Sequence, residues 1–119
     1  MRLWLDDLRP APEGYKWVKS VGEAKIRCCQ HLNPNKELLI EEFDLDHDAG
    51  NYSFAGGDYI ELLKWLEEKA YVENWVINSV FKIHSQNVVG RNNMNAIIER
   101  NSWKKEYEYF TCGRLKEVL

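Results

Sequence analysis

The feature that most restricts the fold of this chain is the alternation of strand-like stretches with stretches of helical periodicity. Strand character is found in residues 3–5, 15–19, 38–45, and in 75–77 with 80–83. Apolar residues recur at helical spacing in 21–32, 59–70 and 90–101. Because strands that alternate with helices form parallel βαβ units, we predict an α/β fold with a small, mainly parallel sheet and flanking helices.

Local signals predict where these elements begin and end. Ser20 and Glu23 match a capping box, and the Asn-Pro-Asn sequence at 33–35 is predicted to end that helix. Residues 49–57 are expected to form a flexible loop, after which Asp58 is predicted to cap the next helix. Residues 102–119 are interpreted as an extension of a 1–101 core, with a last strand in 107–112 and a frayed helix in 115–119.

Length and composition are typical of one small domain. A chain of 119 residues, 45% of them hydrophobic, is large enough for one core and too small for two, so we predict a single domain over 1–119. No apolar run approaches the roughly 20 residues of a membrane helix. Acidic residues at positions 6 and 7 interrupt any signal-peptide core, and the three cysteines form no Cys-x-x-Cys pair. These features predict a cytoplasmic protein without membrane contact.

Acidic residues and histidines gather where the predicted strands end. The segments are Asp6 and Asp7, then Asp46, His47 and Asp48, then His84, Ser85 and Asn87. Ligands of open parallel sheets bind outside the carboxyl ends of the strands, so we expect the three segments to converge on one crevice. Carboxylates that lie close together need a cation to stay ionised, which makes Asp6, Asp7 and Asp46 a candidate Mg²⁺ site. Separate, solvated acids are an equally good interpretation.

Two of the three histidines are candidates for proton transfer. His47 lies between Asp46 and Asp48, where a carboxylate can fix its tautomer. His47 and His84, with Asp46 beside them, can divide general base and general acid work on a phosphodiester. A lone histidine is more often structural, and His31, late on a surface helix, is interpreted in that way.

The segment before the third predicted helix is a candidate phosphate site. Asn87 to Arg91 leads directly into that helix, so backbone N–H groups, the helix dipole and Arg91 can hold a phosphate, with Ser85 and Asn87 beside them. Arg9 can face a phosphate or pair with the nearby acids. An ordinary helix cap with a solvated arginine is the alternative. A formal net charge of −3 disfavours duplex DNA as a partner but is compatible with a small phosphorylated molecule or an RNA end.

Three blocks of sequence contain all of these candidate residues. They are Leu3-Trp4-Leu5-Asp6-Asp7-Leu8-Arg9-Pro10, Leu45-Asp46-His47-Asp48, and His84-Ser85-Gln86-Asn87-Val88-Val89-Gly90-Arg91. In this order, and over the part of the chain before the C-terminal extension, they resemble the cyclic-phosphate-processing receiver-like domain family. That family is related to response-regulator receiver domains, and it has been proposed from sequence context to process cyclic phosphates in RNA or nucleotide metabolism.

The resemblance implies a receiver-like, flavodoxin-like sheet. In such a sheet Asp6 and Asp7 correspond to the acidic metal-binding pair of receivers, and Asp46 corresponds to the strand-end aspartate that receivers phosphorylate. His47 and His84 are the additions that set the family apart. The first receiver helix is reduced here to a loop, and no lysine matches the lysine of the receiver's last strand.

The leading hypothesis is therefore a phosphoesterase that uses Mg²⁺ to process a cyclic phosphate on a nucleotide or an RNA end. Two alternatives stay open. One is a receiver-like signalling module that is phosphorylated on Asp46. The other is a non-catalytic domain that binds a phosphorylated ligand or a protein partner.

Overall fold

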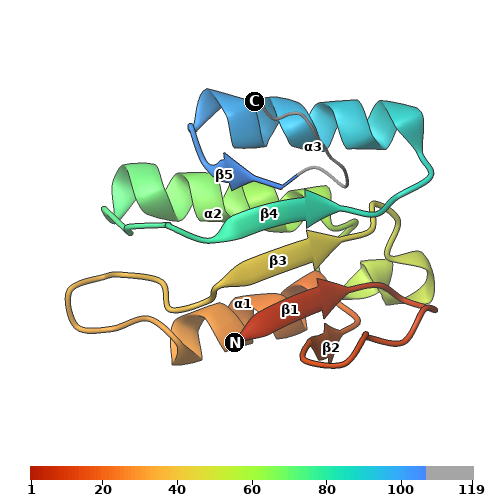
Figure 1. The fold of residues 1–119 in the computed structure, drawn as a ribbon, viewed down its shortest axis with the longest axis horizontal. Helices are drawn as coiled ribbons and strands as arrows, with labels where there is room; N and C mark the ends of the chain where they lie inside the picture. Colours follow the sequence, from red (N-terminus) through yellow and green to blue (C-terminus); the bar gives the residue numbers. More distant parts are fainter. Residues whose placement is uncertain (107–119) are drawn as a thin grey trace, which may run out of the picture.

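Five strands form one parallel sheet in the part of the chain that the computed structural model describes, residues 1–106. The strands are β1 (Arg2–Leu5), β2 (Lys16–Val18), β3 (Glu42–Leu45), β4 (Val80–Ile83) and β5 (Lys104–Lys105), in the order β2-β1-β3-β4-β5 (Figure 1). The helices are α1 (Val21–Gln30), α2 (Ile60–Val72) and α3 (Val88–Arg100), with a short 3₁₀ helix η1 (Gly50–Ala55). Every neighbouring pair of strands is parallel. The predicted receiver-like α/β fold is confirmed.

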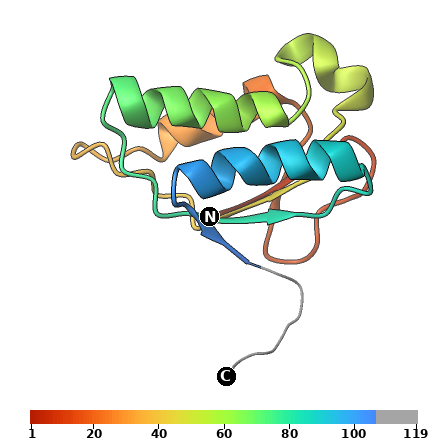
Figure 2. The same cartoon turned by 90° about the horizontal axis from the view of Figure 1, so that it is seen from above.

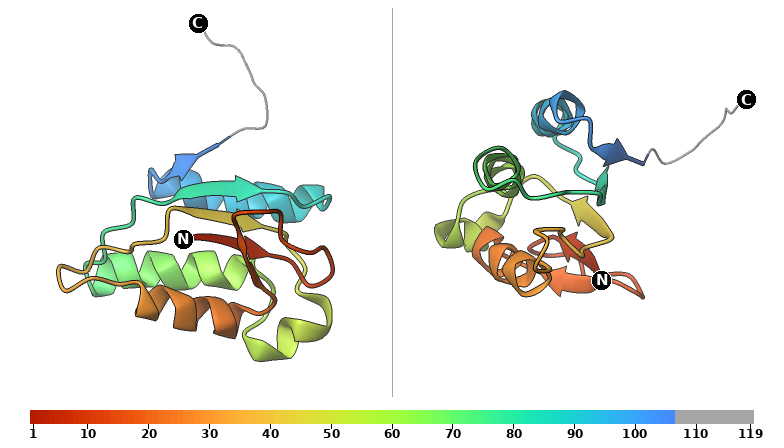
Figure 3. Two further views of the ribbon diagram at one scale, coloured as in Figure 1. Left: turned by 60° about the horizontal axis from the view of Figure 1, so that its bottom comes forward. Right: turned by 90° about the vertical axis from the view of Figure 1, so that its left-hand side faces the viewer.

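The three α-helices pack on the same face of the sheet, as Figures 2 and 3 show. Side chains alternate between the two faces of a strand, and the apolar ones share one face here. Leu3, Phe43 and Phe81 lie side by side on β1, β3 and β4, and Leu5 lies beside Leu45 one pleat further along. All five are fully buried in one core with apolar residues of the helices. Burial of this surface holds the helices against the sheet.

The opposite face of the sheet carries polar and aromatic side chains and, within residues 1–106, no α-helix. Trp4, Asp44 and Lys82 lie side by side there on β1, β3 and β4. The loop before β2 contacts this face through Tyr15, whose ring lies edge-on 6.1 Å from that of Trp4 and whose hydroxyl is hydrogen-bonded to Glu42. This open face leads directly to the acidic residues that follow β1 and β3.

The helix α1 begins at the predicted cap but ends earlier than predicted. The Ser20 hydroxyl accepts a hydrogen bond from the Glu23 N–H at 3.0 Å, and the Glu23 carboxylate accepts one from Lys19, the residue before the cap. The helix ends at Gln30 because Leu32, predicted to be helical, pairs with a leucine of the following loop.

That pairing also shortens the next strand. Residues 38–45 are predicted as one strand, but Leu38 forms an antiparallel bridge with Leu32, and β3 begins only at Glu42. Residues 75–77 likewise stay outside the sheet, because Val76 bridges Glu37 instead.

The segment between β3 and α2 differs most from the prediction. Residues Gly50–Ala55 form η1 where the sequence predicts a flexible loop. Asp58 does not cap α2, since its carboxylate accepts the N–H of Ala49 at 2.9 Å and closes this segment. The third helix begins two residues earlier than predicted, with Asn87 as its cap.

The chain beyond residue 106 carries two predictions that lie outside the described residues, the strand in 107–112 and the helix in 115–119. The strand β5 comes before them and continues the sheet. None of the helices within residues 1–106 combines the length and the apolar character that crossing a membrane requires.

Candidate active site

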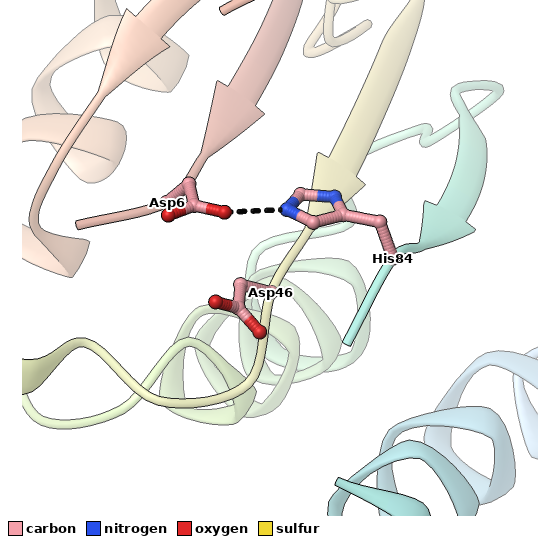
Figure 4. A group of neighbouring side chains, drawn as sticks. All are labelled: Asp6, Asp46 and His84. Atoms are coloured by element: carbon pink, nitrogen blue, oxygen red, sulfur yellow. Dashed lines mark hydrogen bonds and ion pairs between the residues drawn. The ribbon is translucent and has the colours of Figure 1, made fainter. Parts of the chain in front are cut away.

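His84, directly after β4, lies at the centre of the site. Its Nδ1 is 2.7 Å from a carboxylate oxygen of Asp44 on β3, and its Nε2 is 2.9 Å from one of Asp6 after β1 (Figure 4). The imidazole stacks on the indole of Trp4, with ring centres 3.9 Å apart and planes 3° from parallel. The strand order β1-β3-β4 explains the arrangement, because His84 reaches across β3 to the end of β1.

The electrostatics of this arrangement favour a charged His84. Burial disfavours the charged form, but the hydrogen bonds to Asp44 and Asp6 and the negative charge of both outweigh burial and raise the pKa of His84. Both ring nitrogens face carboxylates, which are acceptors only, so both nitrogens are donors when these hydrogen bonds form. This arrangement between two carboxylates therefore favours the imidazolium form of His84.

Asp6 is fixed from both sides and almost fully buried, at 1% exposure. One carboxylate oxygen accepts the N–H groups of Leu8 and Arg9 at 2.9 and 2.8 Å. The other oxygen faces His84 and lies 3.2 Å from Nε of Arg9. Burial tends to raise the pKa of Asp6, but the hydrogen bonds from Arg9, Leu8 and His84 outweigh burial and lower it. Asp6 therefore stays ionised despite its burial.

Asp46 completes an acidic pair with Asp6. Ligand atoms of Asp6, Asp46 and His84 lie within 4.8 Å of one another, and Figure 4 shows Asp46 below the contact between Asp6 and His84. One carboxylate oxygen of Asp46 accepts the N–H of His47 at 2.8 Å. The other oxygen lies 4.0 Å from Nη2 of Arg9. The two carboxylates are oxygen donors that fit a hard divalent cation.

Asp7, the remaining predicted metal ligand, is not part of this group. Its carboxylate lies against Gly50 at the start of η1, where an added Cβ would be only 2.2 Å from an Asp7 oxygen. Gly50 also has a φ of +56°, a conformation that a residue without a side chain adopts at no steric cost. Glycine at position 50 thus leaves room for Asp7 beside the acidic pair.

His47 lies at the other side of Asp46, against the first turn of α3. Its Nδ1 is 2.8 Å from a carboxylate oxygen of Asp48 and 3.5 Å from the side-chain nitrogen of Asn87. A Cβ at Gly90 would approach two carbon atoms of the His47 ring to 2.5 Å, so the ring packs directly on the helix backbone. With Nδ1 donating to Asp48, Nε2 is the nitrogen that can accept a proton. His47, Asp48 and Asp58 also form a second group with close ligand atoms.

The predicted phosphate ligands are two side chains that build the start of α3, Ser85 and Asn87, and two arginines, Arg9 and Arg91. The Ser85 hydroxyl accepts the N–H of Asn87 at 3.0 Å, and the side-chain oxygen Oδ1 of Asn87 accepts the N–H of Gly90 at 2.9 Å, so both side chains build the start of α3. Arg91 is exposed, and its side chain has no hydrogen bond or ion pair within residues 1–106. Arg9 pairs with the acids instead. Among the four, Arg91 is the cation that is not already paired.

Sequence reasoning missed Asp44, which is hydrogen-bonded to His84, and Trp4, on which the His84 ring stacks. Asp44 precedes Asp46 by two residues, and side chains two apart in a strand lie on the same face. That spacing was a usable signal, because it places Asp44 on the face from which Asp6 and Asp46 extend. The stacking of Trp4 on His84 joins residues 80 positions apart and depends on the strand order.

Comparison with known families gives one match. A family described as "Cyclic-phosphate processing Receiver domain" matches residues 1–100, which include every candidate residue named above. No curated protein and no solved structure shows a significant match to the chain.

Proposed function

The chain belongs to the family of cyclic-phosphate-processing receiver domains, and from that premise we propose that it hydrolyses a cyclic phosphate on a nucleotide or an RNA end. The observation that carries the proposal is the difference between the two histidines. Both ring nitrogens of His84 are hydrogen-bonded to carboxylates, whereas in His47 only Nδ1 is hydrogen-bonded to a carboxylate within residues 1–106. A pair of this kind offers a proton donor and a proton acceptor at one sheet edge.

His47 is the proposed general base. Its Nδ1–H donates to Asp48, which leaves Nε2 to take a proton from an attacking water. As the water oxygen bonds to phosphorus, one bond between phosphorus and a ribose oxygen breaks. The product is a phosphomonoester.

His84 is the proposed general acid. Its raised pKa favours the imidazolium, which can give its Nε2 proton to the leaving ribose oxygen. In the structure that proton is donated to Asp6, so the leaving oxygen has to approach on the same side of the ring. His84 then regains a proton from solvent while His47 releases one, and both residues return to their first state.

Asp6 and Asp46, with Asp7 nearby, are the proposed holders of Mg²⁺. The two oxygens of a carboxylate suit this hard cation, and the fixed backbone hydrogen bonds of Asp6 keep its geometry constant. Bound there, Mg²⁺ would stabilise negative charge that develops on the phosphoryl oxygens.

Phosphate binding is proposed for Arg9 and for the start of α3. The N–H groups of Val88 and Val89 have no acceptor within residues 1–106, because the Ser85 and Asn87 side chains bind the neighbouring amides. Free N–H groups at a helix start attract an anion. Arg91 in the first turn adds a charge that can reach the same phosphate.

The proposal is tested by phosphorus NMR of 2′,3′-cyclic nucleotides incubated with the protein, with Mg²⁺ or with a chelator. We expect opening to one monoester, loss of that reaction with chelator, and loss in a His47→Ala variant. A His31→Ala variant is the matched control, since within the described residues the His31 ring hydrogen-bonds just one group, the carbonyl of Arg27 on α1. Turnover that is unchanged in both His47→Ala and His84→Ala proteins would contradict the proposal.

A further inference from the structure

Within residues 1–106, Arg9 is the one residue whose charged group forms ion pairs with both members of the acidic pair, Asp6 and Asp46. We propose that its guanidinium pairs with the acidic pair until a divalent cation replaces it there, and that it then binds a substrate phosphate. The cation and the phosphate therefore bind the site cooperatively. The inference rests on the proposed function, because it concerns the same cation and the same phosphate.

The backbone of Arg9 is fixed while its side chain is not. The N–H of Arg9 donates to Asp6 at 2.8 Å, and the carbonyl accepts the indole N–H of Trp4 at 2.8 Å. The side chain is 51% exposed, and its Nε and Nη2 lie 3.2 and 4.0 Å from carboxylate oxygens of Asp6 and Asp46. A third contact, from Nη2 to the carbonyl of His84, is long at 3.5 Å. The guanidinium can therefore leave while the rest of the residue stays in place.

A cation can replace the guanidinium without rearranging the acids. The Arg9 guanidinium is half-exposed, so water screens part of its attraction to the acids, and its long side chain loses freedom when it pairs with them. The Asp6 carboxylate, by contrast, is held by two backbone N–H groups that do not involve the guanidinium. A divalent ion at Asp6 and Asp46 brings twice the charge of Arg9 and repels it.

A phosphate then becomes the best partner for the displaced group. The backbone of Arg9 still holds it next to Asp6, so its side chain can reach a phosphate that contacts the same cation. Guanidinium groups bind phosphate oxygens with paired hydrogen bonds. Because coupling between two ligands is reciprocal, phosphate should strengthen cation binding by the same factor by which the cation strengthens phosphate binding.

The test is calorimetric titration of the protein with Mg²⁺, with and without inorganic phosphate, corrected for complexes in solution. In the natural chain we expect phosphate to strengthen Mg²⁺ binding at least about fivefold, the lower end of ordinary coupling. An Arg9→Gln variant should bind Mg²⁺ more tightly without phosphate and lose most of the coupling. Arg9→Lys keeps the charge and should keep Mg²⁺ binding close to that of the natural chain, with reduced coupling.

Two controls make the result decisive. Arg27→Gln removes the same charge from α1, where the side chain has no hydrogen bond or ion pair within residues 1–106, and it should leave the coupling intact. The Arg9 Nε–H signal in NMR should shift when Mg²⁺ alone is added. Unchanged Mg²⁺ affinity in Arg9→Gln, unchanged coupling in that variant, or an unmoved Nε–H signal would each overturn the inference.

These titrations involve no turnover, so they separate the inference from the proposed function. Coupling without any reaction of cyclic nucleotides would sustain the role of Arg9 and remove the phosphoesterase. Turnover of cyclic nucleotides, together with unchanged coupling between Mg²⁺ and phosphate in the Arg9→Gln variant, would sustain the proposed function and remove the role of Arg9.

Discussion

The two histidines at the carboxyl edge of the sheet have opposite surroundings. His84 stacks on Trp4 and has carboxylates at both nitrogens. His47 has one carboxylate at Nδ1, and its ring packs on the backbone of α3 at Gly90. The first arrangement restricts both the orientation and the charge of the ring, whereas the second restricts only the orientation.

This difference in surroundings shows that two histidines at one edge of a sheet can differ in how much they contribute to the stability of the fold. His84 compensates the charge of two buried acids, so removing it leaves Asp44 without an ion-pair partner and Asp6 with Arg9 alone. His47 compensates no buried charge, since Asp48 is exposed. We therefore expect substitutions at position 84 to lower both stability and turnover, and substitutions at position 47 to lower mainly turnover.

The largest effect on stability is expected from His84→Ala. Removing one partner of a buried ion pair typically costs about 3–5 kcal/mol, because the other charge is left uncompensated. Here Asp44 loses its ion-pair partner, and Asp6 keeps only Arg9 and two backbone N–H groups. Urea unfolding checks the loss against His31→Ala. A change below about 1 kcal/mol, the upper end of the typical range for exposed pairs, would remove the distinction between the two histidines.

The next effect is on turnover, in His47→Ala. Loss of a positioned acid or base typically lowers the rate by roughly 100-fold or more. Because the ring carries no buried charge, the free energy of unfolding should change by less than in His84→Ala. Phosphorus NMR and urea unfolding of the same sample measure both. A large loss of stability with normal turnover would reverse the assigned roles.

Gly90→Ala should affect His47 without removing it. The added Cβ would meet the His47 ring at 2.5 Å, so either the ring or the start of α3 has to move. A displacement of about 1 Å can lower a rate by up to roughly 100-fold. Asn92→Ala, at an exposed position of the same helix, is the control for helix propensity. Equal turnover in the two variants would show that the contact between Gly90 and His47 is unimportant.

The smallest effect is a dependence of stability on pH. The folded protein raises the pKa of His84 above its ordinary value of 6.5, so the folded state binds that proton more tightly. The stabilisation is complete below pH 6.5 and is lost as the pH rises through the raised pKa. The pH dependence that Asp6 contributes has the opposite direction. Because its pKa is lowered, its contribution to stability is complete above pH 3.8 and is lost as the pH falls through the lowered pKa. An Asp44→Asn variant should show a weaker decline above pH 6.5. An equal decline in both proteins would exclude His84 as its source.

Much of the fold was predictable from local sequence. Ser20 caps α1 as predicted, Asn87 lies in the segment predicted to lead into the third helix, and the apolar residues of the strands and helices show their period directly. Asp58 shows the limit, because the same side chain can cap a helix or close a loop. Its bond to Ala49 depends on how η1 folds back.

The sequence predicted which residues belong to the site better than it predicted how they are arranged. Strand ends identify Asp6, Asp46, His47 and His84, since parallel strands bring their carboxyl ends to one edge. The sequence does not state that β3 lies between β1 and β4. For that reason the contacts of His84 with Asp44 and Trp4, which decide its charge, required the tertiary structure.

The most direct test of this account is heteronuclear NMR of the histidine ring nitrogens at about neutral pH, where histidine side chains can change charge. We expect His84 to keep protons on both nitrogens at pH values above its ordinary pKa of 6.5, and the neutral form of His47 to carry its proton on Nδ1. Assignment uses the His47→Ala and His84→Ala spectra. A His84 ring with one bare nitrogen, beside a His47 that is doubly protonated, would contradict the division of roles between acid and base.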